Sequence, residues 1–313
     1  MKYAVGVDLG GTTVKQGIFT ADGELVTKWE IRTRKQENGK YILSDIAASV
    51  NEALEKNKIK KEDVLGIGMG VPGAIQPDGS VDVCVNLGWG KVQVKEEMEQ
   101  YTGLPVYPAN DANIAALGEM WQGGGKGCHN AVMVTLGTGV GGGIIVDGKI
   151  IAGTSGFGGE IGHMKMRSDE TEVCGCGKTG CLEQYASATG VARMARRTLE
   201  KTDLPSVLRN TDRVTAKDVF DAAKAGDQLG VQIVEEVCDI LALALSYVSC
   251  VCDPEVFIIG GGVSKAGTIL TDTIQKYYTD NVFGGLKKAG FVLATLGNDA
   301  GIYGGAKLAI SES

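Results

Sequence analysis

Residues 4–10, AVGVDLG, are similar to residues 131–137, AVMVTLG, which lie later in the same chain. Apolar residues alternate in the first copy, which predicts a half-buried β-strand. Each copy runs into a glycine-containing turn, a further predicted strand and an Asp-Gly pair, Asp22-Gly23 or Asp147-Gly148. Asp-Gly between strands is typical of a two-residue type I′ hairpin. Self-similarity of this kind predicts two related lobes, with a ligand held in a cleft against both glycine turns.

Two glycine stretches match phosphate-binding patterns only in part. Gly137-x-Gly139-x-x-Gly142 fits the dinucleotide fingerprint, but that motif opens a helix, and a strand is predicted after it here. Gly177-Lys178-Thr179 ends like a Walker A loop, yet the position five residues before Gly177 is Glu172 where that loop needs glycine. We therefore predict a phosphate-binding hairpin at the first stretch and reject the second.

The composition describes an ordinary globular protein. The 313 residues allow about two domains, and 43% are hydrophobic and 22% charged. A formal net charge of -7 supplies no basic surface for nucleic acid, so a nucleic-acid partner is not expected. Glycine is the outlier, with 47 residues that cluster where predicted strands end, as expected of turns that approach phosphates closely.

The sequence offers no membrane partner. The longest apolar run, residues 240–252, is shorter than the roughly 20 residues that a membrane span needs, and it predicts a buried helix. Met1 is followed directly by a strand-like segment, with no charged and apolar leader. We therefore expect a cytoplasmic protein, in a reducing compartment where thiols stay free or bind metal.

A metal site is predicted within residues 158–183, GGEIGHMKMRSDETEVCGCGKTGCLE. His163, Cys174, Cys176 and Cys181 supply one imidazole and three thiols, the ligand set of a closed tetrahedral zinc site. A disulfide is the alternative, but it leaves one cysteine over. A catalytic zinc is disfavoured, because four protein ligands leave no position for water.

Four polar residues are candidates for a binding or catalytic site. Glu160 lies three residues before His163, on one face if the segment is helical, and Glu183 lies two residues after Cys181. Lone glutamates are usually exposed, so surface charge is the alternative for both. Asn110-Asp111 precede a predicted helix, and the alternative there is a helix N-cap.

Periodicity and capping signals predict the remaining elements. We expect strands at 14–26, 64–71, 144–151 and 256–259, and helices from Ser44 to about 54, at 95–101, from 110 onward, at 189–199, at 215–225 with a Thr215 cap, at 231–251 and at the C-terminal end. The glycine turns after residues 259 and 296 could line a nucleoside pocket.

The motifs together resemble the ROK family. They are Asp8-Leu9-Gly10-Gly11-Thr12, the internal repeat, Asn110-Asp111 before a helix, and Glu160-x-x-His163 ahead of Cys-Gly-Cys-Gly-x-x-Gly-Cys-x-Glu. The likeness covers essentially the whole chain and is strongest to the bacterial glucokinases of that family. It implies an α/β, actin-like (ribonuclease H-like) two-lobed ATPase fold with a duplicated βββαβα core, ATP between the lobes and zinc beside a hexose. The implied lobes are residues 1–118 with helix 298–313, and residues 119–297.

The resemblance also implies roles for individual residues. Asp111 matches the general base; Asn110, Asp111, Glu160, His163 and Glu183 match the sugar ligands; and His163, Cys174, Cys176 and Cys181 match the zinc ligands. Asp8, Gly10, Gly11 and Thr12 match the first phosphate turn, with Asp8 associated with Mg²⁺, while Gly137, Thr138 and Gly139 match the second. Gly261 and Gly262 match the adenosine side.

The implied activity is ATP-dependent phosphorylation of glucose to glucose 6-phosphate, with a homodimer as the usual assembly. N-acetylmannosamine, N-acetylglucosamine, mannose and fructose remain alternative substrates. A sugar-responsive repressor is a second class, but the helix-turn-helix of such proteins has no room ahead of the strand at Tyr3. A non-catalytic ATPase explains the repeat but leaves Glu160, His163 and the cysteines without a role.

Overall fold

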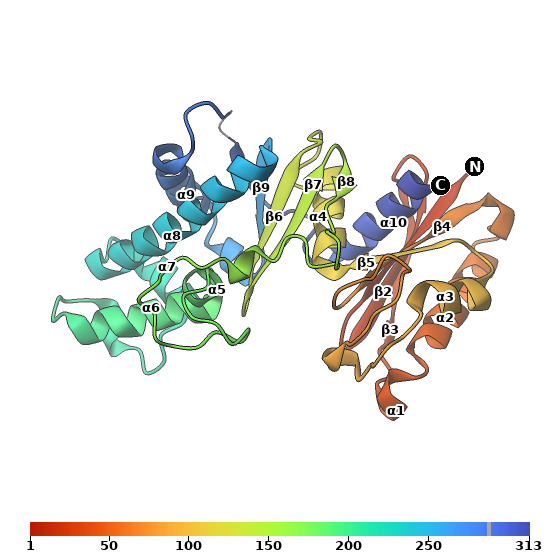
Figure 1. Ribbon diagram of the computed structural model, residues 1–313, viewed down its shortest axis with the longest axis horizontal. Coiled ribbons are helices and arrows are strands. Elements are labelled where there is room, and N and C mark those ends of the chain that lie inside the picture. The colour runs from red at the N-terminus through yellow and green to blue at the C-terminus, as the bar shows by residue number, and fades with distance from the viewer. Residues whose placement is uncertain (287–288) are drawn as a thin grey trace. The chain divides into compact units, whose positions relative to one another are not determined.

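Two five-stranded sheets of the same topology form the fold (Figure 1). The computed structural model describes residues 1–286 and 289–313. The first sheet has the order β3-β2-β1-β4-β5 and the second the order β10-β9-β6-β7-β8, so the second read backwards repeats the first. The strands are β1 (Tyr3–Leu9), β2 (Thr13–Thr20), β3 (Leu25–Arg32), β4 (Val64–Val71), β5 (Val106–Asn110), β6 (Ala131–Leu136), β7 (Val140–Val146), β8 (Lys149–Ile150), β9 (Val256–Gly260) and β10 (Gly290–Leu293). The predicted repeat is confirmed.

The chain divides into two compact units, neither of which is continuous in sequence. Met1–Gly127, Gly143–Gly159 and Thr295–Ser313 form the first unit, and Cys128–Gly142 and Glu160–Ala294 form the second. The C-terminal segment thus belongs with the N-terminal sheet. The lobe boundaries that the resemblance implied, 1–118 with 298–313 and 119–297, stay a prediction.

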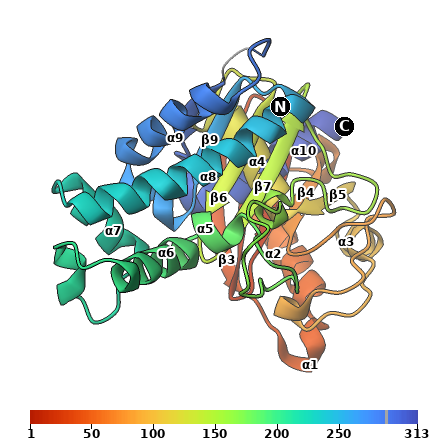
Figure 2. The same ribbon diagram turned by 60° about the vertical axis from the view of Figure 1, so that its left-hand side comes forward.

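In the first unit, alternate residues of β1 face different helices. Val5, Val7 and Leu9 share a buried cluster with Ile46 of α2 (Ile42–Lys56) and Met98 of α3 (Val94–Thr102). On the other face Ala4 and Phe19 pack against α10 (Ala300–Glu312), which lies beside α4 (Asp111–Gln122) in Figures 1 and 2. The alternation along β1 therefore reflects helices on both faces of the sheet.

Glycines let α10 lie directly on the first sheet. Gly6 of β1 and Gly68 of β4 are partners in register. A Cβ atom at Gly6 would overlap the carbonyl oxygen of Ile302, and one at Gly68 would overlap that of Gly305. The backbone of α10 thus occupies the space that side chains on these two strands would need.

The second unit is built around α8 (Gln228–Cys252), which packs against α6 (Ala188–Lys201), α7 (Ala216–Lys224) and α9 (Thr268–Asn281). Thr215 caps α7 in a capping box with Asp218, as predicted. The apolar run at the end of α8 is buried at Leu241 and Leu245, although Val251 is 86% exposed. Among the described residues no helix has the length and apolar character needed to cross a membrane.

The two Asp-Gly turns have different geometries. Asp147 and Gly148 both have positive φ, 51° and 72°, as a type I′ turn requires. At the first turn only Gly23 has positive φ, and the Thr20 N–H donates to the Glu24 carbonyl across a longer loop. The type I′ prediction for Asp22-Gly23 was therefore wrong. A shift in the β2–β3 register at Phe19 changes which residues close the loop.

One helix start was also predicted wrongly. Ser44 is not the N-cap of α2, because the helix begins at Ile42 and Tyr41 occupies the cap position. The Ser44 hydroxyl donates to the Tyr41 carbonyl, 3.0 Å away. Ile42 and Leu43 are both buried, so the first turn of the helix brings apolar side chains into the core.

Candidate functional site

In the first unit, Asp8 and Asp111 lie at the same edge of the sheet. Asp8 on β1 is in register with Gly70 on β4, and Gly70 is in register with Ala109 at the end of β5. Asn110 ends β5 and Asp111 begins α4. The parallel strands therefore bring the first glycine turn and the Asn110-Asp111 pair together.

Asp8 is a carboxyl group in an unusual environment. The pKa of Asp8 is raised to about 6, mainly by burial and also by the negative charge of Asp111, while the positive charge of Lys15 opposes both effects. A Cβ atom at Gly301 would lie 2.5 Å from Cγ of Asp8. Gly301, which belongs to the glycine-containing stretch predicted after residue 296, lies in α10 and leaves the space that this carboxyl group occupies.

Asp8→Asn should make the metal-free protein more stable near neutral pH. Because the pKa of about 6 lies above the ordinary 3.8, the folded protein binds more protons at Asp8 than the unfolded chain does between these values. The resulting stabilisation is complete below about pH 4 and is lost as the pH rises through 6. We expect the free energy of unfolding of the variant to exceed that of the wild type by up to about 3 kcal/mol at pH 7.5 and by little at pH 4.

Urea unfolding with a chelator present, followed by tryptophan fluorescence, measures this difference. Trp29, Trp89 and Trp121 are all the tryptophans of the chain, and all lie in the first unit. Asp22→Asn, at an exposed turn residue, is the control for the loss of one negative charge. An equal gain from Asp8→Asn at both pH values would argue against a buried charge at that position.

Asn110 supplies the N-cap of α4. Its Oδ1 accepts hydrogen bonds from the backbone N–H groups of Ala112, at 2.9 Å, and Asn113, at 3.2 Å. Its amide nitrogen donates to the Gly73 carbonyl at 3.1 Å. Oδ1 of Asp111 also accepts from the Ala112 N–H, at 2.9 Å. The capping alternative is thus realised by Asn110, and the helix start does not depend on Asp111 alone.

The first glycine turn is held in place by Thr33, which was not predicted. The Thr33 hydroxyl donates to the Gly10 carbonyl at 2.7 Å, and the Thr33 N–H donates to the Thr12 carbonyl at 2.9 Å. Gly10 N–H donates to the Thr13 carbonyl within the turn. Thr33 follows β3, some twenty residues from the turn in sequence, so no local pattern connects the two.

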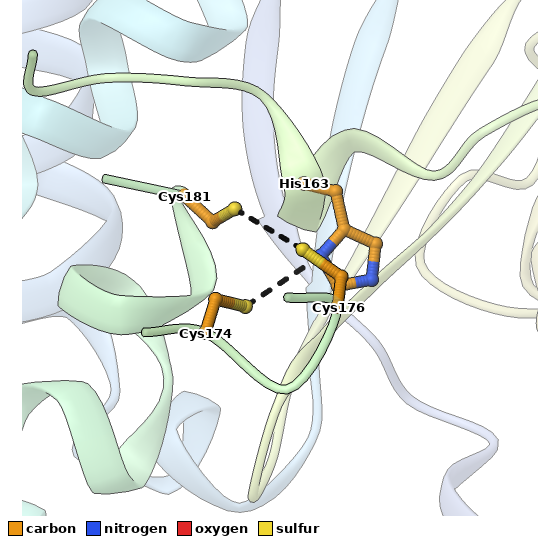
Figure 3. A group of neighbouring side chains, drawn as sticks. All are labelled: His163, Cys174, Cys176 and Cys181. Atoms are coloured by element: carbon orange, nitrogen blue, oxygen red, sulfur yellow. Dashed lines mark hydrogen bonds between the residues drawn. The ribbon is translucent and has the colours of Figure 1, made fainter. Parts of the chain in front are cut away.

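In the second unit, the predicted metal ligands come together. His163 ends a short 3₁₀ helix, η3 (Ile161–His163), and the three cysteines lie on the loop before α5 (Glu183–Ala186). One ligand atom from each of His163, Cys174, Cys176 and Cys181 lies within 4.8 Å of the others. Figure 3 shows the imidazole Nδ1 facing the sulfur of Cys174 at 3.9 Å, with Nε2 on the far side of the ring.

The distances within this cluster fit a tetrahedral ion better than a disulfide. Sγ of Cys176 and Sγ of Cys181 are 3.6 Å apart, well beyond a bonded sulfur pair at about 2.05 Å. Zinc–sulfur bonds of about 2.3 Å give a tetrahedron with edges of about 3.8 Å. Burial raises the pKa of the Cys181 thiol to about 12, so in the metal-free protein this thiol keeps its proton. Binding of a cation would release it.

Ion pairs anchor the cysteine loop to α6. Arg197 forms hydrogen-bonded ion pairs with Glu170, at 2.8 Å, and Glu172, at 2.6 Å, and Arg193 pairs with the same two carboxylates. The Glu170 side chain is only 4% exposed, and Arg197 holds its pKa well below the usual range. The loop is therefore fixed on one side by residues outside the cluster.

The two candidate glutamates occupy different surroundings. Oε2 of Glu160 lies 3.9 Å from Nε2 of His163, and both side chains are exposed. Glu183 instead lies between two groups: Oε2 accepts from the Val140 N–H at 3.1 Å, and the Cys174 sulfur is 3.6 Å from Oε1. Exposure leaves Glu160 and Nε2 of His163 accessible to a polar ligand.

The second glycine turn lies next to Gly261 and Gly262. Gly261 has a φ of 82°, and a Cβ there would lie 2.5 Å from the Leu136 carbonyl oxygen, immediately before the turn at Gly137. Gly262 begins η5 (Gly262–Ala266) and lines a cavity of about 340 Å³ in the second unit. The other lining residues include Val263, from the glycine turn predicted after residue 259, and Ala188, Lys217, Phe220 and Lys224, which were not predicted.

A cavity of about 460 Å³ lies elsewhere in the second unit. It is lined by charged residues, among them Arg167, Glu170 and Arg197, and by none of the predicted site residues. Glu170 and Arg197 already pair with each other. The smaller, more apolar cavity beside Gly262 is therefore the better candidate for a nucleoside.

Known proteins resemble this chain over nearly its whole length. A glucokinase of Halalkalibacterium halodurans is 44% identical, over 97% of this chain and 94% of the relative. The crystal structure of a ROK family glucokinase from Streptomyces griseus in complex with glucose and AMPPNP is 33% identical, covers 98% of both chains and has a TM-score of 0.72. The ROK hexokinase of Thermus thermophilus is 28% identical, with a TM-score of 0.82 and coverage of 99% of this chain and 98% of that one.

The family model named ROK matches residues 4–312, which include both glycine turns, the Asn110-Asp111 pair and the cysteine loop. The structural neighbours confirm the α/β, actin-like ATPase fold, and the two sheets of identical topology account for its duplicated core. The chain belongs to the ROK family.

Proposed function

We propose that this protein is a glucokinase, which transfers the γ-phosphoryl group of ATP to the 6-hydroxyl of glucose. The observation that carries the proposal is the 33–44% identity over nearly the whole chain to proteins named glucokinases, one of them solved with glucose and AMPPNP. The chemistry of the candidate residues agrees with it. Phosphoryl transfer requires a positioned hydroxyl, compensation of phosphate charge and a proton acceptor.

Asp111 is proposed to accept the proton of the attacking hydroxyl. Its carboxylate stands at the first position of α4, while Asn110 provides two capping hydrogen bonds. As the sugar oxygen bonds to the γ-phosphorus, its proton passes to the Asp111 carboxylate and ADP leaves with the electrons of the broken bond. Asn110, Glu160, His163 and Glu183 are proposed to orient the sugar through its hydroxyls.

The glycine turns are proposed to bind the nucleotide. Backbone N–H groups at Gly11 and Thr12, and at Thr138 and Gly139, are suited to phosphate oxygens. The N–H groups of Gly10 and Gly137 close the two turns, because they donate to the Thr13 and Gly139 carbonyls. The cavity beside Gly262, with the ring of Phe220 among its lining residues, suits an adenosine group. Asp8 is proposed to hold Mg²⁺, which when bound compensates phosphate charge. The raised pKa of Asp8 fits a carboxyl group that needs a cation to be ionised.

Zinc is proposed to hold the sugar ligands in position. With Nδ1 of His163 facing the cysteine sulfurs, Nε2 remains for a sugar hydroxyl, next to Glu160. A metal bond to Nδ1 would fix both the tautomer and the ring orientation. Cys176→Ser should therefore lose most of the bound zinc and weaken glucose binding at least tenfold. Metal analysis by mass spectrometry and glucose titration by calorimetry measure both effects, with Cys250→Ser, on the exposed end of α8, as the control.

A coupled assay of ADP release with Mg-ATP, run over a panel of hexoses, tests the proposed activity. We expect glucose to give the highest kcat/KM, with N-acetylmannosamine, N-acetylglucosamine, mannose and fructose as the competing substrates. Absence of turnover with every hexose would refute the kinase assignment, and a preference for another sugar would correct the substrate. We further propose that the protein forms a homodimer, which light scattering can test. We also propose that it resides in a reducing cytoplasm, where all eight cysteines stay free of disulfides.

A further inference from the structure

The second glycine turn is held by residues that directly follow the cysteine loop. The backbone N–H of Ala188 donates to the Gly137 carbonyl at 2.8 Å, and the Thr189 hydroxyl donates to the Thr138 carbonyl at 2.8 Å. Ala188 and Thr189 begin α6, seven and eight residues after Cys181. Two successive carbonyl groups of the turn are thus fixed by the start of one helix.

Glu183 connects the same turn to the cluster itself. Its Oε2 accepts from the Val140 N–H at 3.1 Å, while the Cys174 sulfur lies 3.6 Å from Oε1. The contact leaves no free space, because a Cβ atom at Gly139 would overlap Oε2 of Glu183. Glycine at position 139 is therefore needed for the carboxylate to reach the turn.

The opposite end of the cluster contacts the turn as well. Gly162 precedes the ligand His163, and a Cβ atom at Gly162 would overlap the Val140 carbonyl oxygen. The turn is consequently packed between the segment that carries His163 and the segment that follows Cys181. An ion that joined His163 to Cys181 would fix these two segments relative to each other.

We propose that the Cys/His cluster and the second glycine turn act as one mechanical unit, in which Glu183 and Thr189 are positioning residues for the turn. Metal in the cluster orders the turn and raises the affinity for nucleotide phosphate groups. The inference rests on the proposed function, and it extends the expected role of the metal beyond the sugar. It gives Glu183 a structural role, the positioning of the turn through Val140, that does not depend on a sugar hydroxyl.

Hydrogen exchange and nucleotide titration on the full chain test this proposal. Removing metal with a chelator should speed amide exchange in a peptide covering residues 137–141 at least tenfold, with no change in a peptide covering residues 10–13 of the first turn. Affinity for Mg-AMPPNP without sugar, measured by calorimetry, should fall several-fold. Readdition of Zn²⁺ should restore both.

Thr189→Val separates the turn from the metal and the sugar. It removes the hydroxyl that holds the Thr138 carbonyl and that lies 2.9 Å from the Ser187 hydroxyl, but it leaves every cluster and sugar candidate in place. We expect about fivefold weaker AMPPNP binding, as for the loss of the one hydrogen bond that reaches the turn, with unchanged zinc content and glucose affinity. Thr198→Val on the same helix is the control, because the Thr198 hydroxyl donates to the Met194 carbonyl within α6, at 2.9 Å.

Different results refute the inference and the function. Unchanged exchange at 137–141 after chelation, whether the wild type held no metal or the turn did not respond, overturns the inference. Unchanged AMPPNP affinity in Thr189→Val also overturns it, as does an equal loss in Thr198→Val. Failure of the wild type to bind AMPPNP refutes the proposed function instead, and the exchange experiment still decides whether cluster and turn are coupled.

Discussion

Asp111→Asn is expected to lower kcat for glucose phosphorylation by about 10²- to 10⁴-fold while the fold is retained. The substitution deletes the proton acceptor and keeps the size of the side chain. The remaining amide oxygen can still accept from the Ala112 N–H, and Asn110 continues to cap α4. Steady-state kinetics measure the loss, and circular dichroism and AMPPNP binding show whether the variant is folded.

A second readout distinguishes a charged group at the site from a structural residue. The negative charge of Asp111 contributes to the raised pKa of Asp8, so Asp111→Asn should lower the pKa of Asp8 in a carboxyl NMR titration. Asp22→Asn changes the net charge equally at an exposed turn and should alter neither kcat nor the Asp8 titration. A kcat near that of the wild type would return Asp111 to a role in starting the helix.

Gly68→Ala is expected to destabilise the first unit by about 3 kcal/mol or more, the upper range for overpacking a core. The new methyl group would overlap the carbonyl oxygen of Gly305, a backbone atom that cannot rotate away. Either α10 shifts from the sheet or β4 bends. A shift of α10 would also move Gly301 away from Asp8, so activity should fall together with stability.

Urea unfolding followed by tryptophan fluorescence reports this effect selectively, since all three tryptophans lie in the first unit. Gly70→Ala is the matched control: Gly70 is also a glycine of β4 in the first unit, and a Cβ there would lie 3.6 Å from its nearest atom, an ordinary van der Waals distance. Equal midpoints for Gly68→Ala and the wild type would show that α10 can move away at little cost.

Local signals predicted much of the fold. Strands β4 and β6 end where expected, because short apolar runs between turn residues specify buried strands without reference to the rest of the chain. The four candidate metal ligands were also found from sequence, since their residue types are distinctive and they lie within about twenty positions of one another. The two Asp-Gly pairs show the limit of such signals, because pairing register decided their different geometries.

Contacts between distant segments could not be predicted in this way. Glu119 is a charged residue of α4 and would be expected on the surface of the helix, yet it is fully buried. Its carboxylate accepts hydrogen bonds from the backbone N–H groups of Gly124, Thr295 and Leu296 at 2.8–3.0 Å. Two of these donors are more than 170 positions away in sequence. The same distance hides the bond from Glu183 to Val140, whose partners carry no complementary pattern.

The place of α10 in the first unit has a consequence for synthesis on the ribosome. The five strands of the first sheet are translated before residue 128, but the helix that covers Ala4 and Phe19 begins only at Ala300. At roughly 5–20 residues per second, the nascent chain waits on the order of ten to forty seconds for it. During this time an apolar sheet face with exposed glycine backbone is open to chaperones or to other chains. The unit that begins the polypeptide is thus the one completed last. Expression in cells grown slowly at low temperature with added chaperone should therefore increase the yield of soluble protein.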